Sequence, residues 1–221
     1  MSTRLVQPTP GGALGARRLT RSDLLAAAAC AVVGLAGAAC YYSDTLRPLP
    51  HTYAIWVLLV VLVSARQPPV RGVIRGGAGL LISVVAFFYG KQGIYDILYP
   101  GPGLPYRVSL DELALWGAIG VVGGSALGWL ASRIGQVGWL PAAVSATAIA
   151  LPVVEAYQRS VDYSDVGPVA VVAALGAITV LGIGDRSRLQ LLRTAWMLIP
   201  AGLLAAVVLA GPDQIRSILG H

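Results

Sequence analysis

The stretch LALWGAIGVVGGSALGWLAS, residues 113–132, contains no charged side chain. A helix of about 20 apolar residues crosses the hydrocarbon core of a bilayer, so this stretch predicts a membrane span. Gly120, Gly124 and Gly128 recur in it at every fourth position, which places them on one helical face. Such a face lets the backbone of a neighbouring helix approach closely. The sequence therefore predicts a helix that packs tightly inside a membrane bundle.

Other apolar stretches lie on both sides of this one. The predicted spans are Leu24–Tyr42, His51–Ala65, Gly76–Tyr89 with an extension as far as Tyr99, Leu113–Ser132, Trp139–Tyr157, Pro168–Gly184 and Thr194–Gly211. The second and third are short for a bilayer. The breaks between spans are basic or rich in proline and glycine, which favours loops there.

The composition of the whole chain agrees with a membrane protein. Of 221 residues, 56% are hydrophobic and 12% are charged, and the mean hydropathy is +0.73. A soluble domain is about one-quarter charged, so this chain lacks the polar surface of one. We expect an all-α transmembrane bundle of about seven spans in residues 23–212. A flexible basic tail, residues 1–22, precedes it, and a short tail, residues 213–221, follows it.

The cations predict the orientation of the bundle. With the N-terminus inside, eleven of the sixteen Lys and Arg residues face the cytoplasm. The five outer ones are Arg47, Lys91, Arg107, Arg159 and Arg216. The positive-inside rule then predicts a cytoplasmic N-terminus, an outer C-terminus and a multi-pass protein of the plasma (inner) membrane. The net charge of +6 indicates contact with anionic membrane lipids rather than nucleic acid.

The first span has a second interpretation. A basic region, an apolar run and the small residues 36–40 also resemble a cleaved signal sequence, and cleavage stays an open alternative. Ala26, Cys30, Gly34 and Ala38 form a small-residue stripe on this span. Cys40 lies ten residues after Cys30, about 15 Å away on a helix, which is too far for a disulfide. We expect no metal site and no cofactor, because no ligand motif is present.

Polar chemistry gathers on the predicted outer side. All nine tyrosines and eight of the ten carboxylates lie there on this topology. An aromatic belt would mark both membrane interfaces, so the outer tyrosines exceed what a belt requires. We therefore expect an outer cavity lined by tyrosine.

Glu155 is the strongest single candidate for a functional acid. It lies in LPVVEAY, residues 151–157, three residues after Pro152. An acid within a span is rare and usually faces the bundle interior. It can serve there as a proton donor; the alternative is an interfacial ion pair with Arg159, four residues on.

A second acid accompanies a polar face on the third span. The spacing of Tyr89, Gln92, Asp96 and Tyr99 puts them on one face if the helix continues through Gly90; the alternative is a loop. The candidate catalytic residues are thus Glu155 and Asp96. The candidate substrate-binding residues are Tyr41, Tyr89, Gln92, Tyr99, Trp116 and Tyr157.

About seven helices in 221 residues, acids within the membrane and no DDxxD motif resemble the small integral-membrane terpene cyclases. The resemblance implies cyclisation of a lipophilic isoprenoid-type substrate through a carbocation. Glu155 and Asp96 would then be the proton donor and its partner, with aromatic faces stabilising the cation. Residues 56–157 are also similar to small actinobacterial membrane proteins, in WVLL, GAGLL and PVVEA.

Two other functions compete with the enzyme. The small-residue stripe on the first span also resembles substrate-binding subunits of vitamin importers, so a transport or binding subunit, including a proton-coupled one, is an alternative. A structural membrane protein without a catalytic site is the third. The sequence identifies neither the substrate nor a partner protein.

Overall fold

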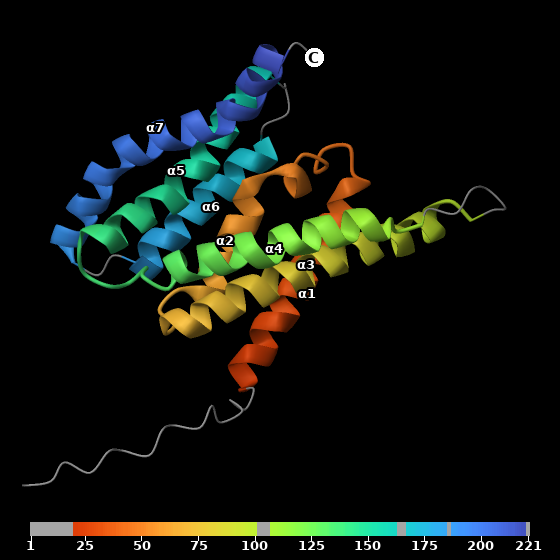
Figure 1. The fold of residues 1–221 in the computed structure, drawn as a ribbon, viewed down its shortest axis with the longest axis horizontal. Helices are drawn as coiled ribbons and strands as arrows, with labels where there is room; N and C mark the ends of the chain where they lie inside the picture. Colours follow the sequence, from red (N-terminus) through yellow and green to blue (C-terminus); the bar gives the residue numbers. More distant parts are fainter. Residues whose placement is uncertain (1–19, 101–106, 163–166, 185–186, 220–221) are drawn as a thin grey trace, which may run out of the picture.

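The computed structural model describes residues 20–100, 107–162, 167–184 and 187–219. Helices account for the regular structure of these residues, and no strand occurs among them, so the all-α prediction is confirmed. The elements are α1 (Arg21–Tyr41), the 3₁₀-helix η1 (Leu49–His51), α2 (Tyr53–Ser64), α3 (Pro69–Leu98), α4 (Leu110–Ala131), α5 (Trp139–Asp162), α6 (Gly167–Gly184) and α7 (Arg188–Leu219). Figure 1 shows their arrangement.

Six of the described helices, all except α2, are long and apolar enough to cross a membrane. Their composition is that of a membrane-helix bundle, and their order follows the predicted spans. The orientation and the number of passes stay predictions. Most of the basic tail, residues 1–19, lies outside the described residues; α1 begins at Arg21 and α7 continues to Leu219.

Helix α3 is longer than the apolar run, Gly76–Tyr89, from which the third span was predicted. Instead of ending at Tyr89, α3 continues through Gly90 and Gly93 to Leu98, so the loop alternative is wrong. The reason at Gly90 is packing: a Cβ there would lie 2.9 Å from the Cβ of Ala38 on α1. Gly90 therefore permits a close helix contact rather than ending the helix.

Polar contacts at both ends show that α1 and α3 run parallel. Near the start of both helices, Asp23 of α1 pairs with Arg71 and Arg75 of α3. Near the other end, the hydroxyl of Tyr42 donates to the carbonyl of Lys91, at 3.0 Å. The chain that leaves α1 must therefore return to the first end before α3 begins. The connection, η1 and α2 make this return.

The returning helix α2 lies at the centre of the fold. It packs against α3 and α4 on one side and against α5 and α6 on the other, between the two groups of helices in Figure 1. Its side chains are buried around most of the helix, including Val57, Val60 and Val63. A helix that is hydrophobic on all faces is expected at such a position.

The predicted glycine face of α4 forms the closest helix contact. Gly72 and Gly76 of α3 face Gly128 and Gly124 of α4, in antiparallel order. A Cβ on Gly124 would come within 2.9 Å of the carbonyl carbon of Gly76, so only glycine fits this approach. The prediction of close backbone packing at this face is confirmed. The stripe on α1 also packs: Gly34 lies against the backbone of Ser83.

Helices α5, α6 and α7 form the second group, in which α5 and α7 also pack through small residues. Small side chains join α5 to α7, with Ala146 and Ala150 against Ala201. Gln190 near the start of α7 exchanges two hydrogen bonds of 3.1 Å with the backbone of Gly138, just before α5. Helices α5 and α7 are therefore parallel as well. The chain runs back from the end of α5 to the start of α7 through α6, and α5 packs against both.

Candidate functional site

Glu155 lies inside the bundle, where α5 meets the start of α2. Its side chain is 5% exposed. One oxygen, Oε2, accepts hydrogen bonds from the backbone amides of Tyr53, at 2.7 Å, and Ala54, at 3.2 Å. These are the first two residues of α2, whose N-terminal amides have no partner within the helix. Glu155 therefore caps α2 from a different helix.

Arg159 completes this arrangement one turn further along α5. Its Nη2 lies 3.4 Å from Oε1 of Glu155 and donates to the carbonyl of His51 at 2.8 Å. The ion pair that was the alternative interpretation of Glu155 thus forms. Because both carboxylate oxygens are engaged, the geometry gives Glu155 a role in joining α5 to η1 and α2. Whether it transfers a proton stays a prediction.

The polar face of α3 is helical, as the spacing predicts, but it is not enclosed. Tyr89 and Asp96 are exposed, Gln92 is half-buried, and Tyr99 lies at the C-cap. The ring of Tyr99 contacts that of Tyr95 in a tilted arrangement, with the ring centroids 5.0 Å apart. Side chains that neighbouring helices leave uncovered do not by themselves form a cavity.

The remaining candidates lie on three different helices. Tyr157 of α5 is 69% exposed and Trp116 of α4 is 52% exposed. Tyr41, at the end of α1, contacts the rings of His51 and Phe87 at 5.7 and 6.4 Å. The described contacts thus bring Tyr41 and Glu155 to the same region around η1, while Tyr157 and Trp116 are exposed on α5 and α4.

The structure places a cavity at the other end of α1 and α3. It measures about 680 Å³ and lies between these helices. Its wall is mostly apolar, and its lining residues include Leu24, Ala27, Cys30, Ile74, Ala78 and Ile82. Asp23, Arg71 and Arg75 also line it. The volume is in the usual range of ligand pockets, about 300–1,000 Å³, but the hollow is a groove that is open along one side rather than an enclosed pocket.

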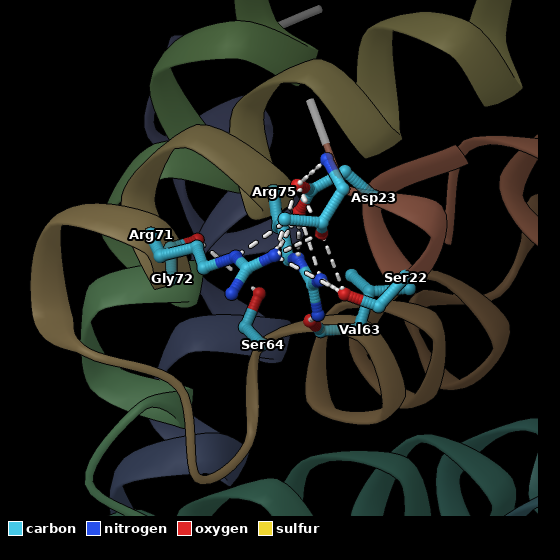
Figure 2. A network of polar contacts seen from close by, with 8 residues as sticks. Ser22, Asp23, Val63, Ser64, Arg71, Gly72 and Arg75 are labelled. Atoms are coloured by element: carbon cyan, nitrogen blue, oxygen red, sulfur yellow. Dashed lines mark hydrogen bonds and ion pairs between the residues drawn. The ribbon is translucent and has the colours of Figure 1, made fainter. Parts of the chain in front are cut away.

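The charged residues of this cavity form one network, drawn in Figure 2. Asp23 accepts from the Nε atoms of Arg71, at 3.1 Å, and Arg75, at 2.9 Å. Arg75 also donates to Ser22, at 2.7 Å, and to the carbonyl of Val63, at 3.3 Å. Its side chain is 10% exposed and that of Arg71 is 29% exposed. Arg71 is therefore the more accessible cation.

The sequence places both arginines between the second and third predicted spans, on the predicted cytoplasmic side. The available signal was their spacing: Arg71 and Arg75 are four residues apart and share a helical face. Asp23 is one of the two acids on the predicted inner side. Its contact with arginines some fifty positions away depends on the parallel packing of α1 and α3, which the sequence alone did not indicate.

Metal binding finds no support in the part of the chain that the structure describes, where no three His, Cys, Asp or Glu side chains gather. Both cysteines are free thiols, as their spacing predicts. No protein-family model matches the sequence, and neither a curated protein nor a solved structure shows significant similarity to the chain.

Proposed function

We propose that this protein binds an anionic phospholipid of the membrane leaflet at the α1–α3 cavity. The hydrocarbon chain would lie along the apolar wall, and the phosphate would lie beside Arg71. The observation that supports this is the combination of an apolar cavity of about 680 Å³ with two arginines and one aspartate at its edge. This binding function is closer to the predicted binding subunit than to the predicted enzyme.

The charge balance favours an anion. Two guanidinium groups face one carboxylate, so the network carries one net positive charge. The arginines also lie in the first two turns of α3, where the helix dipole disfavours cations. A phosphate would offset both effects. Arginine offers planar paired donors that match phosphate oxygens.

The predicted orientation agrees with this assignment. This end of the bundle is the predicted cytoplasmic side, where anionic lipids concentrate and attract basic residues. The apolar wall begins next to the charged network, so a lipid could place its headgroup and its chain at suitable depths together.

The experiment compares lipid retention by the full chain. The protein is reconstituted in nanodiscs with equal amounts of phosphatidylglycerol and phosphatidylcholine, and retained lipids are counted by native mass spectrometry. We expect phosphatidylglycerol to be retained preferentially. Arg71→Gln should weaken that retention about fivefold, because a cation near the surface contributes about 1 kcal/mol to anionic-lipid binding.

A matched control separates a specific site from general charge. Arg188 is an exposed cation at the start of α7, on the same predicted side. Arg188→Gln removes the same charge and should leave retention unchanged. An apolar block, Ala78→Leu, should reduce retention of the hydrocarbon chain without changing the charge. Equal loss in Arg71→Gln and Arg188→Gln would refute the site.

Carbocation cyclisation with Glu155 and Asp96 as the acids stays a prediction and is independent of the proposed lipid binding. It requires Glu155 to release the α2 amides or to act while bonded to them. Polyprenyl substrate turnover with Glu155→Gln tests it directly.

A further inference from the structure

The α1–α3 cavity has one charged end and one closed end. At the charged end, Thr20 and Asp23 accept hydrogen bonds from the guanidinium of Arg71. At the other end, the hydroxyl of Ser83 on α3 donates to the carbonyl of Cys30 on α1, at 2.8 Å. The cavity lies between these two contacts, so its length is set by the distance between them.

The closed end is a close contact of the two helices. A Cβ on Gly34 would overlap the carbonyl of Ser83 and would lie 2.8 Å from the Cβ of Ala86. A Cβ on Gly79 would lie 2.9 Å from the Sγ of Cys30, and both residues line the cavity. Between the described parts of α1 and α3, a hydrocarbon chain therefore cannot continue past this contact.

The length of the cavity matches the depth of one membrane leaflet. From Thr20 to Cys30, the first helix rises about 15 Å, and from Arg71 to Ser83, the third rises about 18 Å. The hydrocarbon core of a bilayer is about 30 Å thick, so one leaflet is about 15 Å deep. A lipid whose phosphate lies at Arg71 would therefore bring the end of its chain to the closed end.

The open side of the cavity is apolar. Leu24 of α1 and Ile74 of α3 line the cavity and are 60% and 57% exposed. Ala27 and Ala78, which also line it, have short side chains that leave space between the helices. In a membrane bundle, exposed apolar side chains contact lipid tails. A lipid of the same leaflet could thus enter sideways, without moving its chain through water.

We propose that the α1–α3 cavity holds an acyl chain of an anionic phospholipid from the predicted cytoplasmic leaflet, with the terminal methyl group of the chain at the contact of Cys30 with Ser83. This proposal rests on the lipid binding proposed above and adds the depth of the chain. Gly79 would be the residue that determines specificity for chain length, because the absence of a side chain there leaves room for the last carbons.

The experiment locates the two ends of the chain in the full-length protein. Two phosphatidylglycerols carry a photoreactive diazirine, one near the ester and one at the terminal methyl group. Each is added to nanodiscs of phosphatidylcholine that contain the protein, and the residues labelled on irradiation are identified by mass spectrometry. We expect the near-ester probe to label Leu24 and Ile74, and the terminal probe to label Cys30 and Ile82.

The order of the labels decides the depth of the chain. Labelling of the same residues by both probes would overturn the proposal, and so would labels spread evenly over the exposed sides of α4 and α7. If another protein chain covers the cavity, neither probe labels it, and the proposal is also wrong. The lipid binding itself is tested separately, by the loss of phosphatidylglycerol retention in Arg71→Gln. A failure of the depth assignment is therefore distinguishable from a failure of the binding site.

A substitution at the closed end tests the role of Gly79. Gly79→Ala adds a methyl group against Cys30 and leaves the charge unchanged. It should lower labelling of Ile82 by the terminal probe about fivefold, the lower end of the cost of overpacking, and leave near-ester labelling unchanged. Gly93→Ala is the matched control on the same helix, because its Cβ would meet nothing within 4 Å.

Unfolding curves show whether each variant is folded. If Gly79→Ala does not fold, Ala78→Leu decides by the same comparison, because it fills the cavity before the closed end. Terminal labelling of Ile82 that is equal in the folded variant and in Gly93→Ala would refute the assigned depth.

Discussion

Removing the carboxylate of Glu155 should destabilise the bundle more than any exposed substitution on α5. Glu155→Ala removes the acceptor of two α2 amides and the partner of Arg159. Removal of one member of a buried charged pair costs about 3–5 kcal/mol. Two orphaned amides at about 1–3 kcal/mol each give a similar total. The expected loss in the free energy of unfolding is therefore about 3–5 kcal/mol.

Glu155→Gln separates hydrogen bonding from charge. The amide oxygen can still accept from Tyr53 and Ala54, while the charge that pairs with Arg159 is lost. We expect a loss of about 1–2 kcal/mol, the difference between charged and neutral hydrogen bonds. Arg159→Gln should cost about 0–1 kcal/mol for its partly exposed ion pair and about 1 kcal/mol for the bond to His51.

The assay is equilibrium unfolding of the full chain in mixed micelles, followed by near-ultraviolet circular dichroism. Tyr157→Phe, on an exposed position two residues away, serves as the matched control and should stay within about 0.5 kcal/mol of the wild type. A loss below about 1 kcal/mol in Glu155→Ala would refute the capping role. That result would also favour the predicted role of Glu155 as a proton donor.

A further prediction concerns helix packing. Gly124→Ala should destabilise the α3–α4 contact by about 1–3 kcal/mol, because its Cβ would overlap Gly76. Gly123→Ala meets nothing within 4 Å and should be neutral or stabilising by up to about 1 kcal/mol, so equal unfolding free energies would contradict the packing argument.

The fold was largely readable because membrane spans leave a local signal. Uncharged runs located the six long helices, and the glycines at every fourth position of α4 predicted its tight contact. Hydropathy alone did not predict the full length of α3, because its last turns are polar and still helical. At the end of α3, Lys91 and Asp96 made the sequence look like a loop, although the backbone stays helical to Leu98.

The candidate sites were harder to predict because they depend on pairs far apart in the chain. Glu155 meets Tyr53 from 102 positions away, and Asp23 meets Arg71 from 48. Sequence spacing places a side chain on a helical face but does not say which helix covers that face. The face at Tyr89 illustrates this: its helical spacing was right, and yet Tyr89 is left exposed by its neighbours.

The shortness of α2 gives a physical reason for the buried acid. Twelve residues extend about 18 Å, less than the roughly 30 Å of a hydrocarbon core. The return from α1 to α3 therefore includes irregular backbone within the bundle, where each polar group needs a partner. The carbonyls of η1 obtain theirs from side chains: Leu49 from the hydroxyl of Thr52, Pro50 from the indole of Trp56, and His51 from Arg159.

Glu155 supplies the acceptor for the first two amides of α2 in the same way. Completing the hydrogen bonds at the start of α2 is therefore a sufficient structural reason for its burial. The cavity cations lie at another place in the fold, where Arg71 and Arg75 line the α1–α3 cavity. The proposed lipid binding should therefore depend on Arg71, while Glu155 and Arg159 determine whether the start of α2 stays in place.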